Sequence, residues 1–340
     1  MTADPCDVRE TASIAGAPTE RATERLGTAP ADIARAGDML ARGELVAFPT
    51  ETVYGLGANA RDAQAVAALY AAKERPRFNP LIAHLPSAEA ALRAGIFDAN
   101  ARLLAQAFWP GPLTLVVPLM DRSGICDLAR SGLDSVALRV PAHPVARALL
   151  EAAGVPVVAP SANRSGRVSP THEAHVVAEL DGRIDAILAG GATRVGVEST
   201  IVACLASAPH LLRAGGVPSE EIEAVLKVRL ARAPSSEEGA PLAPGALASH
   251  YAPRARVRLG AREARAGEAA LAFGPELPGE AAISLNLSRT GNLAEAAANL
   301  FGFLRELDAA QPDVIAVAPV PEGGLGEAIN DRLRRAASER

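Results

Sequence analysis

The chain has 340 residues, of which 49% are hydrophobic and 21% are charged, and its formal net charge at pH 7 is −5. This length allows one large domain or two ordinary ones, and the composition supports a sizeable core and excludes wholesale disorder. The net negative charge argues against indiscriminate nucleic-acid binding, which needs a basic surface, but leaves room for a local basic concavity.

The cysteines and the N-terminus indicate which cellular compartment to expect. Cys6, Cys126 and Cys204 lie far apart and form no CxxC pair. This spacing excludes a zinc ribbon and argues against a disulfide framework, so we expect a reducing cytosol. The first residues lack a basic region followed by an apolar one, and no apolar run reaches the ~18 residues of a membrane span. A soluble, cytoplasmic protein with no membrane partner is expected.

The first predicted elements lead to a polar turn. Residues 1–27 are small, polar and aperiodic, so we expect a disordered tail there. A helix is predicted from Pro30 to Gly43, followed by a buried strand at 45–48. The turn after this strand holds hydroxyls and glycines, which allow positive φ or close approach to a ligand; its residues are Thr50, Glu51, Thr52, Gly55 and Gly57.

A dense group of polar side chains ends the next helix. Asp62 is predicted to cap this helix, and a strand at 81–85 follows it. The group comprises Lys73, Arg75, Arg77 and Asn79 around Pro76. Cations at a helix C-terminus usually only compensate the helix dipole, and turn hydroxyls are usually ordinary turn residues. Since dipole compensation needs only one cation, the density favours a site for a small polyanion.

The remaining elements continue the alternation of strands and helices. Helices are predicted at 87–108, 144–153, from Ser169-Pro170 and up to Val228, and strands at 113–117, 135–140, 155–160, 184–188, 197–202 and 211–213. Arg139 lies among apolar neighbours in its strand, so it needs a carboxylate or phosphate partner from the protein or a ligand. His172 and His175 share a helical face without a third ligand, so no metal site is expected.

A second unit follows a segment of linker composition. Residues 229–256 are rich in Ala, Pro, Ser and Gly, interrupted by His250-Tyr251. Strands near 269–273, 281–285 and 314–318, with a helix at 293–307, predict a small parallel α/β domain at 257–340. Its glycines, Gly323, Gly324 and Gly326, lack an acidic residue at dinucleotide spacing and are a weak signal.

Several long strings, in order along the chain, resemble one known family. They are FPTETVYGLG, KERPRFNPLIAH, FWPGPLTLVV, VALRVPAHP, APSANRSGRVSPT and VESTIV, with GALASHYAPRA and PEGGLGEAINDRL further on. Together they resemble the YrdC family of threonylcarbamoyl-AMP synthases in its long, two-domain form, over residues 28–335. The resemblance implies an α/β fold: a twisted, mixed open sheet with flanking helices at 28–228, a lid-forming linker at 229–256 and a small Rossmann-like domain at 257–340.

The resemblance implies a reaction that needs no protein nucleophile. L-threonine, bicarbonate or CO2 and ATP would give threonylcarbamoyl-AMP and pyrophosphate, for threonylcarbamoyladenosine modification of tRNA. The product would pass to a tRNA threonylcarbamoyltransferase complex. The sequence has no GxxxxGK[ST], GxSxG or HExxH motif, which agrees with such a reaction. Lys73 and Arg75, with Mg²⁺ brought by ATP, would offset the triphosphate charge.

The family's ligand contacts carry over residue by residue. Threonine would lie against Thr52, His84, Arg139, Ser161 and Ser199, and ATP against Arg75, Asn79, Ser135, Asn163, Thr171, Arg213 and Tyr251. Arg139 would pair the amino acid's carboxylate through its planar fork. Ser169 could take the role of Thr171. Asp331 departs from the neutral or basic residue that the family pattern leads us to expect, and this affects the second domain only.

Two other functional classes compete with the synthase. One is a double-stranded RNA-binding module, against which the net charge of −5 counts, although weak RNA binding is left open. The other is the carbamoyl-adenylating unit of hydrogenase maturation factors, which have zinc fingers that this chain has no CxxC to supply. The motif set favours the synthase over both.

Overall fold

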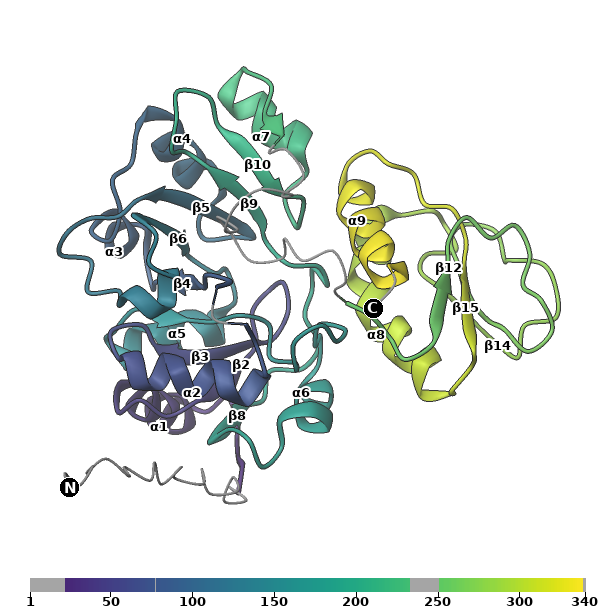
Figure 1. The fold of residues 1–340 in the computed structure, drawn as a ribbon, viewed down its shortest axis with the longest axis horizontal. Helices are drawn as coiled ribbons and strands as arrows, with labels where there is room; N and C mark the ends of the chain where they lie inside the picture. The colour runs from purple at the N-terminus through teal and green to yellow at the C-terminus, as the bar shows by residue number, and fades with distance from the viewer. Residues whose placement is uncertain (1–21, 77, 233–250, 339–340) are drawn as a thin grey trace, which may run out of the picture.

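The computed structural model of the chain describes residues 22–76, 78–232 and 251–338. Figure 1 shows a large N-terminal domain, residues 22–232, beside a smaller C-terminal domain, residues 256–338. Arg77, His250, most of the expected tail and the middle of the expected linker lie outside the described residues. No helix within the described ranges is long and apolar enough to cross a membrane.

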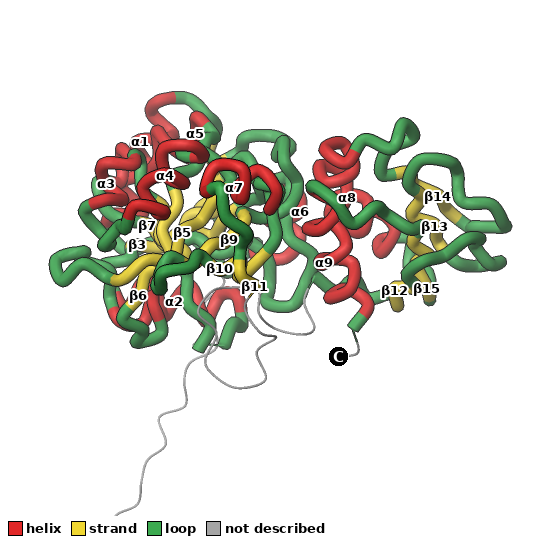
Figure 2. The backbone as a smooth tube through the Cα atoms, turned by 90° about the horizontal axis from the view of Figure 1, so that it is seen from above, coloured by secondary structure: helices red, strands yellow, loops and turns green. Residues whose placement is uncertain are grey.

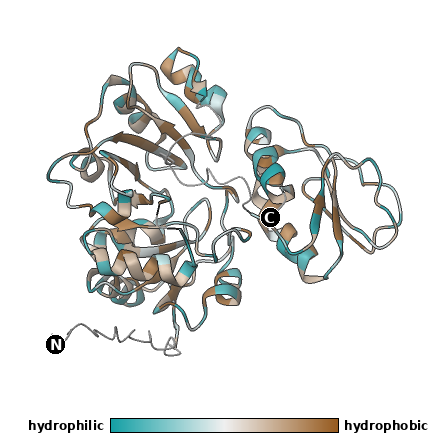
Figure 3. Ribbon diagram, in the orientation of Figure 1, coloured by the Kyte–Doolittle hydropathy of each residue, from teal (hydrophilic) through white to brown (hydrophobic). Residues whose placement is uncertain are grey.

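The N-terminal domain is built on one mixed sheet of 11 strands in the order β1-β8-β2-β3-β7-β4-β6-β5-β9-β10-β11. The strands are β1 (Glu24–Leu26), β2 (Val46–Phe48), β3 (Gly55–Asn59), β4 (Ile82–His84), β5 (Leu113–Pro118), β6 (Ser135–Arg139), β7 (Val157–Val158), β8 (Ala186–Leu188), β9 (Thr200–Ala203), β10 (His210–Arg213) and β11 (Ala231–Arg232). The strands in the middle of this sheet are mostly hydrophobic (Figure 3), as expected for strands covered on both faces. The mixed open sheet confirms the predicted fold class.

Helices cover the sheet through two separate cores. The helices α1 (Pro30–Ala41) and α5 (Pro144–Ala153) pack on each other and form one core with the edge containing β1, β8 and β2. The larger core takes in α2 (Ala63–Lys73), α3 (Ala88–Leu92), α4 (Ala99–Phe108), the 3-10 helix η1 (Asp127–Arg130), α6 (Glu173–Leu180) and α7 (Ser219–Leu226). Asp62 caps α2 as predicted, since its side chain accepts a hydrogen bond from Gln64 N at 2.8 Å.

The alternation of strand side chains determines where polar residues gather. In β6, Val136 and Leu138 enter the larger core, so Ser135 and Arg139 project from the opposite face. In β4, Ala83 faces the same core and His84 the opposite face. The register places His84 beside Arg139 on parallel strands. The central strands therefore present their polar side chains together on one face of the sheet.

Three local predictions are wrong in detail. Gly55 begins the strand β3 rather than continuing a polar turn; a Cβ on Gly57 would lie 3.0 Å from Phe48 Cε1, so close packing across the sheet favours glycine. The helix α6 begins at Glu173, because Ser169 Oγ donates to Glu198 Oε1 instead of capping. Finally, Glu24–Leu26 pair with β8 as β1, although a tail was expected through residue 27.

The C-terminal domain is a small parallel α/β unit, as predicted. Its sheet has the order β12-β15-β13-β14, and all its strand pairs are parallel. The elements are β12 (Arg256–Arg258), β13 (Ala269–Ala272), β14 (Ile283–Asn286), α8 (Leu293–Ala309), β15 (Val314–Val317) and α9 (Leu325–Ala337). The strand β12 and the helix α9 were not predicted. Figures 1 and 2 place α8 and α9 between this sheet and the N-terminal domain.

The two domains share a hydrophobic core. Val53, Val168 and Val197 of the N-terminal domain belong to the same buried cluster as the inner residues of α8 and α9. The approach is close: a Cβ on Gly196, whose φ is +78°, would lie 2.2 Å from the carbonyl oxygen of Ala297 in α8. Arg305 of α8 also pairs with Glu179 of α6, with 2.5 Å between Nη2 and Oε1. The C-terminal domain is thus packed against the N-terminal domain by apolar, backbone and ionic contacts.

Candidate active site

A small cavity lies on the polar face of the central strands and is also lined by Tyr251, from the segment that leads to the C-terminal domain. Its volume is about 50 Å³. Seven of the predicted site residues line it: Arg75, His84, Arg139, Ser161, Ser199, Arg213 and Tyr251. Glu198, for which the sequence suggested no role, lines it as well. The fold therefore brings together these seven residues from distant segments of the chain.

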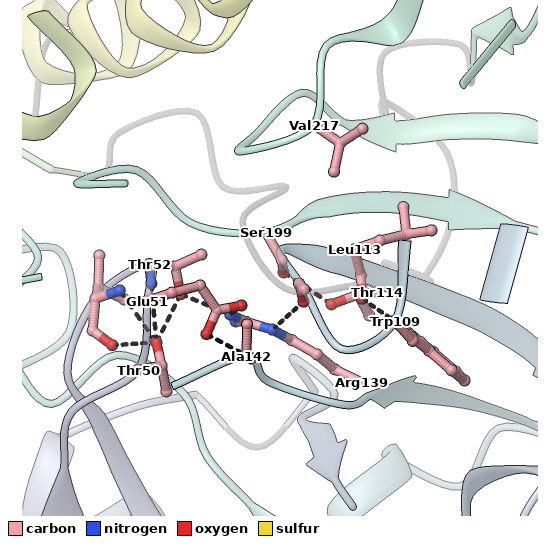
Figure 4. A network of polar contacts seen from close by, with 12 residues as sticks. Thr50, Glu51, Thr52, Trp109, Leu113, Thr114, Arg139, Ala142, Ser199 and Val217 are labelled. Carbon is pink, nitrogen blue, oxygen red and sulfur yellow. Dashed lines mark hydrogen bonds and ion pairs between the residues drawn. The ribbon is translucent and has the colours of Figure 1, made fainter. Parts of the chain in front are cut away.

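Arg139 is held in the wall of this cavity by a protein carboxylate (Figure 4). Its Nη2 donates to Glu51 Oε1 at 2.7 Å and to Thr52 Oγ1 at 2.9 Å, and its Nε donates to Gly111 O at 3.3 Å. Glu51 Oε2 also accepts a hydrogen bond from Ala142 N at 3.1 Å. Burial alone would raise the pKa of Glu51, but the Arg139 guanidinium and these hydrogen bonds hold that pKa below its usual value. The partner that a buried arginine requires is thus Glu51.

Hydroxyl groups on two sides of Arg139 are fixed by one another. Thr50 and Thr52 share a hydrogen bond of 2.7 Å between their Oγ1 atoms, and Thr50 Oγ1 donates to Val53 O at 2.6 Å. Thr114 Oγ1 and Ser199 Oγ lie 2.7 Å apart (Figure 4). These bonds limit the rotamers of the hydroxyls, so they can recognise a ligand without first being ordered.

His84 is a neutral polar group in this wall. The ring is buried, and its Nδ1 donates to Ile82 O at 3.1 Å. The Phe48 ring meets it edge-on, with 6.4 Å between the centroids. Burial, with the positive charge of Arg139, lowers the pKa of His84 to about 3. At neutral pH His84 therefore offers hydrogen bonding without adding charge.

Cations outnumber carboxylates around the cavity. Arg75, Arg139 and Arg213 line it, and Glu198 is the one carboxylate among the described lining residues. The contacts of Arg75 are weak: its Nη2 lies 3.5 Å from Asn79 O and 3.4 Å from Pro80 O, and its buried Nε has no partner among the described residues. Burial lowers the pKa of Arg75 to about 10, which still leaves it charged at pH 7. Such a wall is suited to an anion that supplies the missing hydrogen bonds.

Lys73 does not line the cavity but ties down a loop that does. Its ammonium donates to Ser161 O at 2.5 Å and to Asn163 O. Burial, reinforced by the charge of Arg75, lowers the pKa of Lys73 to about 7. Asn163 in turn donates from Nδ2 to Arg164 O at 2.8 Å and to Arg167 O at 3.0 Å. Lys73 thus fixes the position of the loop that carries Ser161.

Five other predicted contacts lie outside the small cavity. Thr52 lies behind it, bonded to Arg139, and Ser135 is buried on the same face of β6. Asn79 and Asn163 each have a buried Oδ1 with no hydrogen-bond partner in the described parts of the chain. Thr171 lines a different, larger cavity of about 790 Å³, together with residues of α6 and α8.

The described residues contain no group of three or more His, Cys, Asp or Glu side chains that could hold a metal ion. His172 and His175 lie with 6.2 Å between their ring centroids, and they line the larger cavity.

Sequence reasoning missed two acidic residues and one arginine at the site. Glu51 and Glu198 lie within the quoted strings FPTETVYGLG and VESTIV, so their position was visible but their role was not. Arg332 of α9 pairs with Glu198, with 2.9 Å between Nε and Oε2, and is fully buried. Its signal was its spacing from Ala328 and Ile329, which puts it on the apolar face of the helix.

Comparison with known proteins identifies the family. Residues 38–215 match the family model described as "Telomere recombination", and residues 217–338 match the one described as "Threonylcarbamoyl-AMP synthase, C-terminal domain". A threonylcarbamoyl-AMP synthase of Bacillus subtilis (strain 168) is 40% identical over 334 residues, which cover 94% of this chain and 96% of the relative. One from Pyrococcus abyssi is 42% identical over 320 residues, covering 90% and 94%.

A solved structure agrees with these relatives over both domains. The crystal structure of P. abyssi Sua5 complexed with L-threonine matches with a TM-score of 0.83 at 38% identity, covering 94% of this chain and 98% of that one. A match of this extent includes both the N-terminal and the C-terminal domain. The chain belongs to the threonylcarbamoyl-AMP synthase family.

Proposed function

We propose that this protein is an ATP-dependent nucleotidyltransferase that makes threonylcarbamoyl-AMP from L-threonine, bicarbonate or CO2, and ATP. The threonine amine adds to CO2 and loses a proton, giving a carbamate. A carbamate oxygen then forms a bond to the α-phosphorus of ATP, and the bond from that phosphorus to pyrophosphate breaks. The observation that carries the proposal is the cavity in which three guanidinium groups converge beside fixed hydroxyls and a neutral histidine. Its role in this reaction is positioning and charge neutralisation.

We assign the threonine subsite to the region around Arg139. Thr52, His84, Ser161 and Ser199 surround it and offer neutral hydrogen-bonding groups. Because Nε and Nη2 of Arg139 are bonded to protein groups, Nη1 is the end of the guanidinium that makes no hydrogen bond with a described residue. Threonine's carboxylate would therefore meet Arg139 through this one end, rather than through the planar fork that the sequence suggested.

We assign the nucleotide subsite to Arg75, Arg213 and Tyr251. The first two provide positive charge for the phosphates, and the unpartnered Oδ1 atoms of Asn79 and Asn163 are available to accept hydrogen bonds from the nucleotide. Lys73, which was expected to act directly on the triphosphate, would act as a positioning residue through the loop that it holds. Ser135 and Thr171 keep their proposed ATP contacts only if the bound nucleotide reaches beyond the small cavity.

The size of the cavity implies a movement. Ligand sites usually measure ~300–1,000 Å³, much more than the 50 Å³ found here. Tyr251 is the lining residue that comes from the segment between the two domains, and its backbone has a φ of +62°. We propose that Tyr251 moves outward to admit ATP and returns to exclude water from the reactive mixed anhydride.

Magnesium belongs to the proposal as part of the nucleotide substrate. The described residues form no metal-ligating cluster, and the cavity's carboxylate, Glu198, is already paired with Arg332. These residues do not fit a resident metal cage. Mg²⁺ bound to phosphate oxygens commonly keeps several waters and needs few protein ligands.

The biological setting follows from the product. A threonylcarbamoyl adenylate is consumed by transfer of its acyl group, and we propose that a tRNA threonylcarbamoyltransferase complex in the cytoplasm takes it for threonylcarbamoyladenosine formation. The RNA-binding and maturation-factor alternatives are not favoured, because relatives matched over at least 90% of this chain are named synthases.

The test is product analysis with single omissions. The protein is incubated with ATP, Mg²⁺, bicarbonate and threonine, and the nucleotide products are identified by mass spectrometry. Threonylcarbamoyl-AMP and pyrophosphate should require all the reactants. Serine should be a poorer substrate by about 1–3 kcal/mol, because it lacks the methyl group of threonine. Equal pyrophosphate release with alanine, or without bicarbonate, contradicts the proposal.

A further inference from the structure

A buried ion pair joins the C-terminal domain to the wall of the cavity. Glu198 lines the cavity just before β9, and Arg332 of α9 donates from Nε to its Oε2 at 2.9 Å. Ser169 donates to the other carboxylate oxygen, Oε1, at 2.5 Å. Arg332 has 0% of its surface exposed, and its Nη1 donates to Asp331 Oδ2 at 2.7 Å. The remaining nitrogen, Nη2, is buried without a partner among the described residues.

The same arginine touches the wall residue Tyr251. The Cζ atom of Arg332 lies 5.2 Å from the centroid of the tyrosine ring, within the range of a cation–π contact. Phe301 of α8 stacks on that ring, with 5.4 Å between centroids and an interplanar angle of 25°. Two residues of the C-terminal domain therefore define where Tyr251 lies.

The charge of Glu198 is the wrong sign for the ligands proposed for this cavity. Its other charged lining residues are Arg75, Arg139 and Arg213. An unpaired carboxylate among them would cancel part of their positive potential and would repel phosphate groups. Burial alone would raise the pKa of Glu198, but Arg332, Arg213 and the Ser169 hydroxyl hold it below its usual value, so the group stays ionised. The site therefore needs a cation that neutralises Glu198 from outside the cavity.

We propose that Arg332 of the C-terminal domain is a positioning residue for the anion site, which neutralises Glu198 and steadies Tyr251. This inference rests on the proposed function, since it takes the phosphates of ATP as the anion. It gives the C-terminal domain a defined role: without Arg332, the negative charge of Glu198 would be offset only by the N-terminal domain's own Arg213 and Ser169, at the expense of the positive charge available to an anion. A pair that only held the domains together would affect every ligand alike, whereas the proposed role affects anions.

The experiment compares anionic and neutral probes in full-length protein. Binding of pyrophosphate, ATP and adenosine is measured by calorimetry for the wild type, R332M, E198Q and E198Q/R332M. R332M should weaken pyrophosphate and ATP binding by at least about tenfold, which is about 1.4 kcal/mol, and change adenosine binding by less than about threefold. E198Q/R332M should restore pyrophosphate affinity to within about threefold of the wild type, because the unpaired carboxylate is gone.

Control variants distinguish an effect of charge on anion binding from an effect on folding. R258M removes an ion pair of the same domain, Arg258 with Glu268, that does not touch the small cavity, and it should leave pyrophosphate binding unchanged. If R332M does not fold, R332K and E198Q decide: both should bind pyrophosphate within about threefold of the wild type, because neither leaves a bare carboxylate.

Pyrophosphate binding by R332M equal to that of the wild type overturns the inference, as does failure of E198Q to restore binding in the double variant. A loss of tenfold or more in E198Q alone also overturns it. Absence of ATP and pyrophosphate binding in the wild type contradicts the proposed function itself, and the inference with it.

Discussion

Replacement of Arg139 by methionine tests the threonine subsite and its structural support separately. Arg139 and Glu51 have side chains only 5% exposed, and 2.7 Å separates Nη2 from Oε1. Removal of one member of a buried pair leaves the other charge unpaired, so R139M should lower the free energy of unfolding by about 3–5 kcal/mol. If Arg139 also pairs threonine's carboxylate, R139M should in addition weaken the interaction with threonine by ~2–5 kcal/mol. Threonine-dependent activity should then fall roughly 30-fold to several thousand-fold.

A second substitution makes the two effects distinguishable. R139M/E51Q removes the unpaired carboxylate as well, so it should recover most of the stability lost in R139M. It should not recover threonine use, because the guanidinium is still absent. ATP affinity should stay within about threefold of the wild type in both variants, since Arg75 and Arg213 are intact.

The assays are urea unfolding for stability, pyrophosphate release against threonine concentration for activity, and calorimetry for ATP binding. R258M is the matched control for loss of a partly buried arginine outside the cavity. A stable R139M/E51Q protein with the wild-type KM for threonine would refute the reasoning and make Arg139 a structural residue.

Three further predictions concern the other walls of the cavity. Because the pKa of Lys73 is lowered to about 7, the unfolded chain binds more protons than the folded one above pH 7, so the free energy of unfolding should rise with pH. Urea unfolding at pH 7 and pH 9 should show a rise roughly 2 kcal/mol larger in the wild type than in K73M, and equal changes would contradict this. Tyr251→Ala should lower the free energy of unfolding by about 3–5 kcal/mol and weaken ATP binding, measured by thermal unfolding and calorimetry. Y251F, which keeps the ring, should lose less stability than Y251A. Wild-type ATP affinity in Y251A would argue against a role of Tyr251 in the cavity wall. In urea unfolding, R332M should lower the free energy of unfolding by about 3–5 kcal/mol, and E198Q/R332M should lower it clearly less. If the loss in the double variant equals the sum of the losses in the two single variants, the pair is not coupled.

The elements predicted correctly are those specified by neighbouring residues. Asp62 lies next to the helix that it caps, and the apolar residues that predicted the strand at 135–140 belong to the strand itself. The errors occur where tertiary contacts decide. Ser169 followed by Pro170 has the pattern of a helix start, but the serine hydroxyl is used by Glu198, which lies 29 positions away in the sequence.

The candidate site shows the same division. The apolar surroundings of Arg139 predicted that it needs an anionic partner, but Glu51 lies 88 positions away and only the fold identifies it. Arg332 and Glu198 are separated by 134 positions and belong to different domains. The motif strings pointed to residues that line one cavity, but they could not show which of them are already paired within the protein.

The pairing pattern shows how a residue of the C-terminal domain contacts the wall of a cavity in the N-terminal domain. Buried guanidinium groups are costly unless anions satisfy them, and the contacts of Arg75 to Asn79 O and Pro80 O are long, at 3.5 and 3.4 Å. A protein carboxylate could satisfy such a group, but it would occupy the place of the substrate. In the structure each carboxylate is paired with an arginine: Glu51 with Arg139, and Glu198 with Arg332 of the C-terminal domain. The positive potential that remains is available to ATP and threonine, and its size depends on an arginine that the N-terminal domain does not contain.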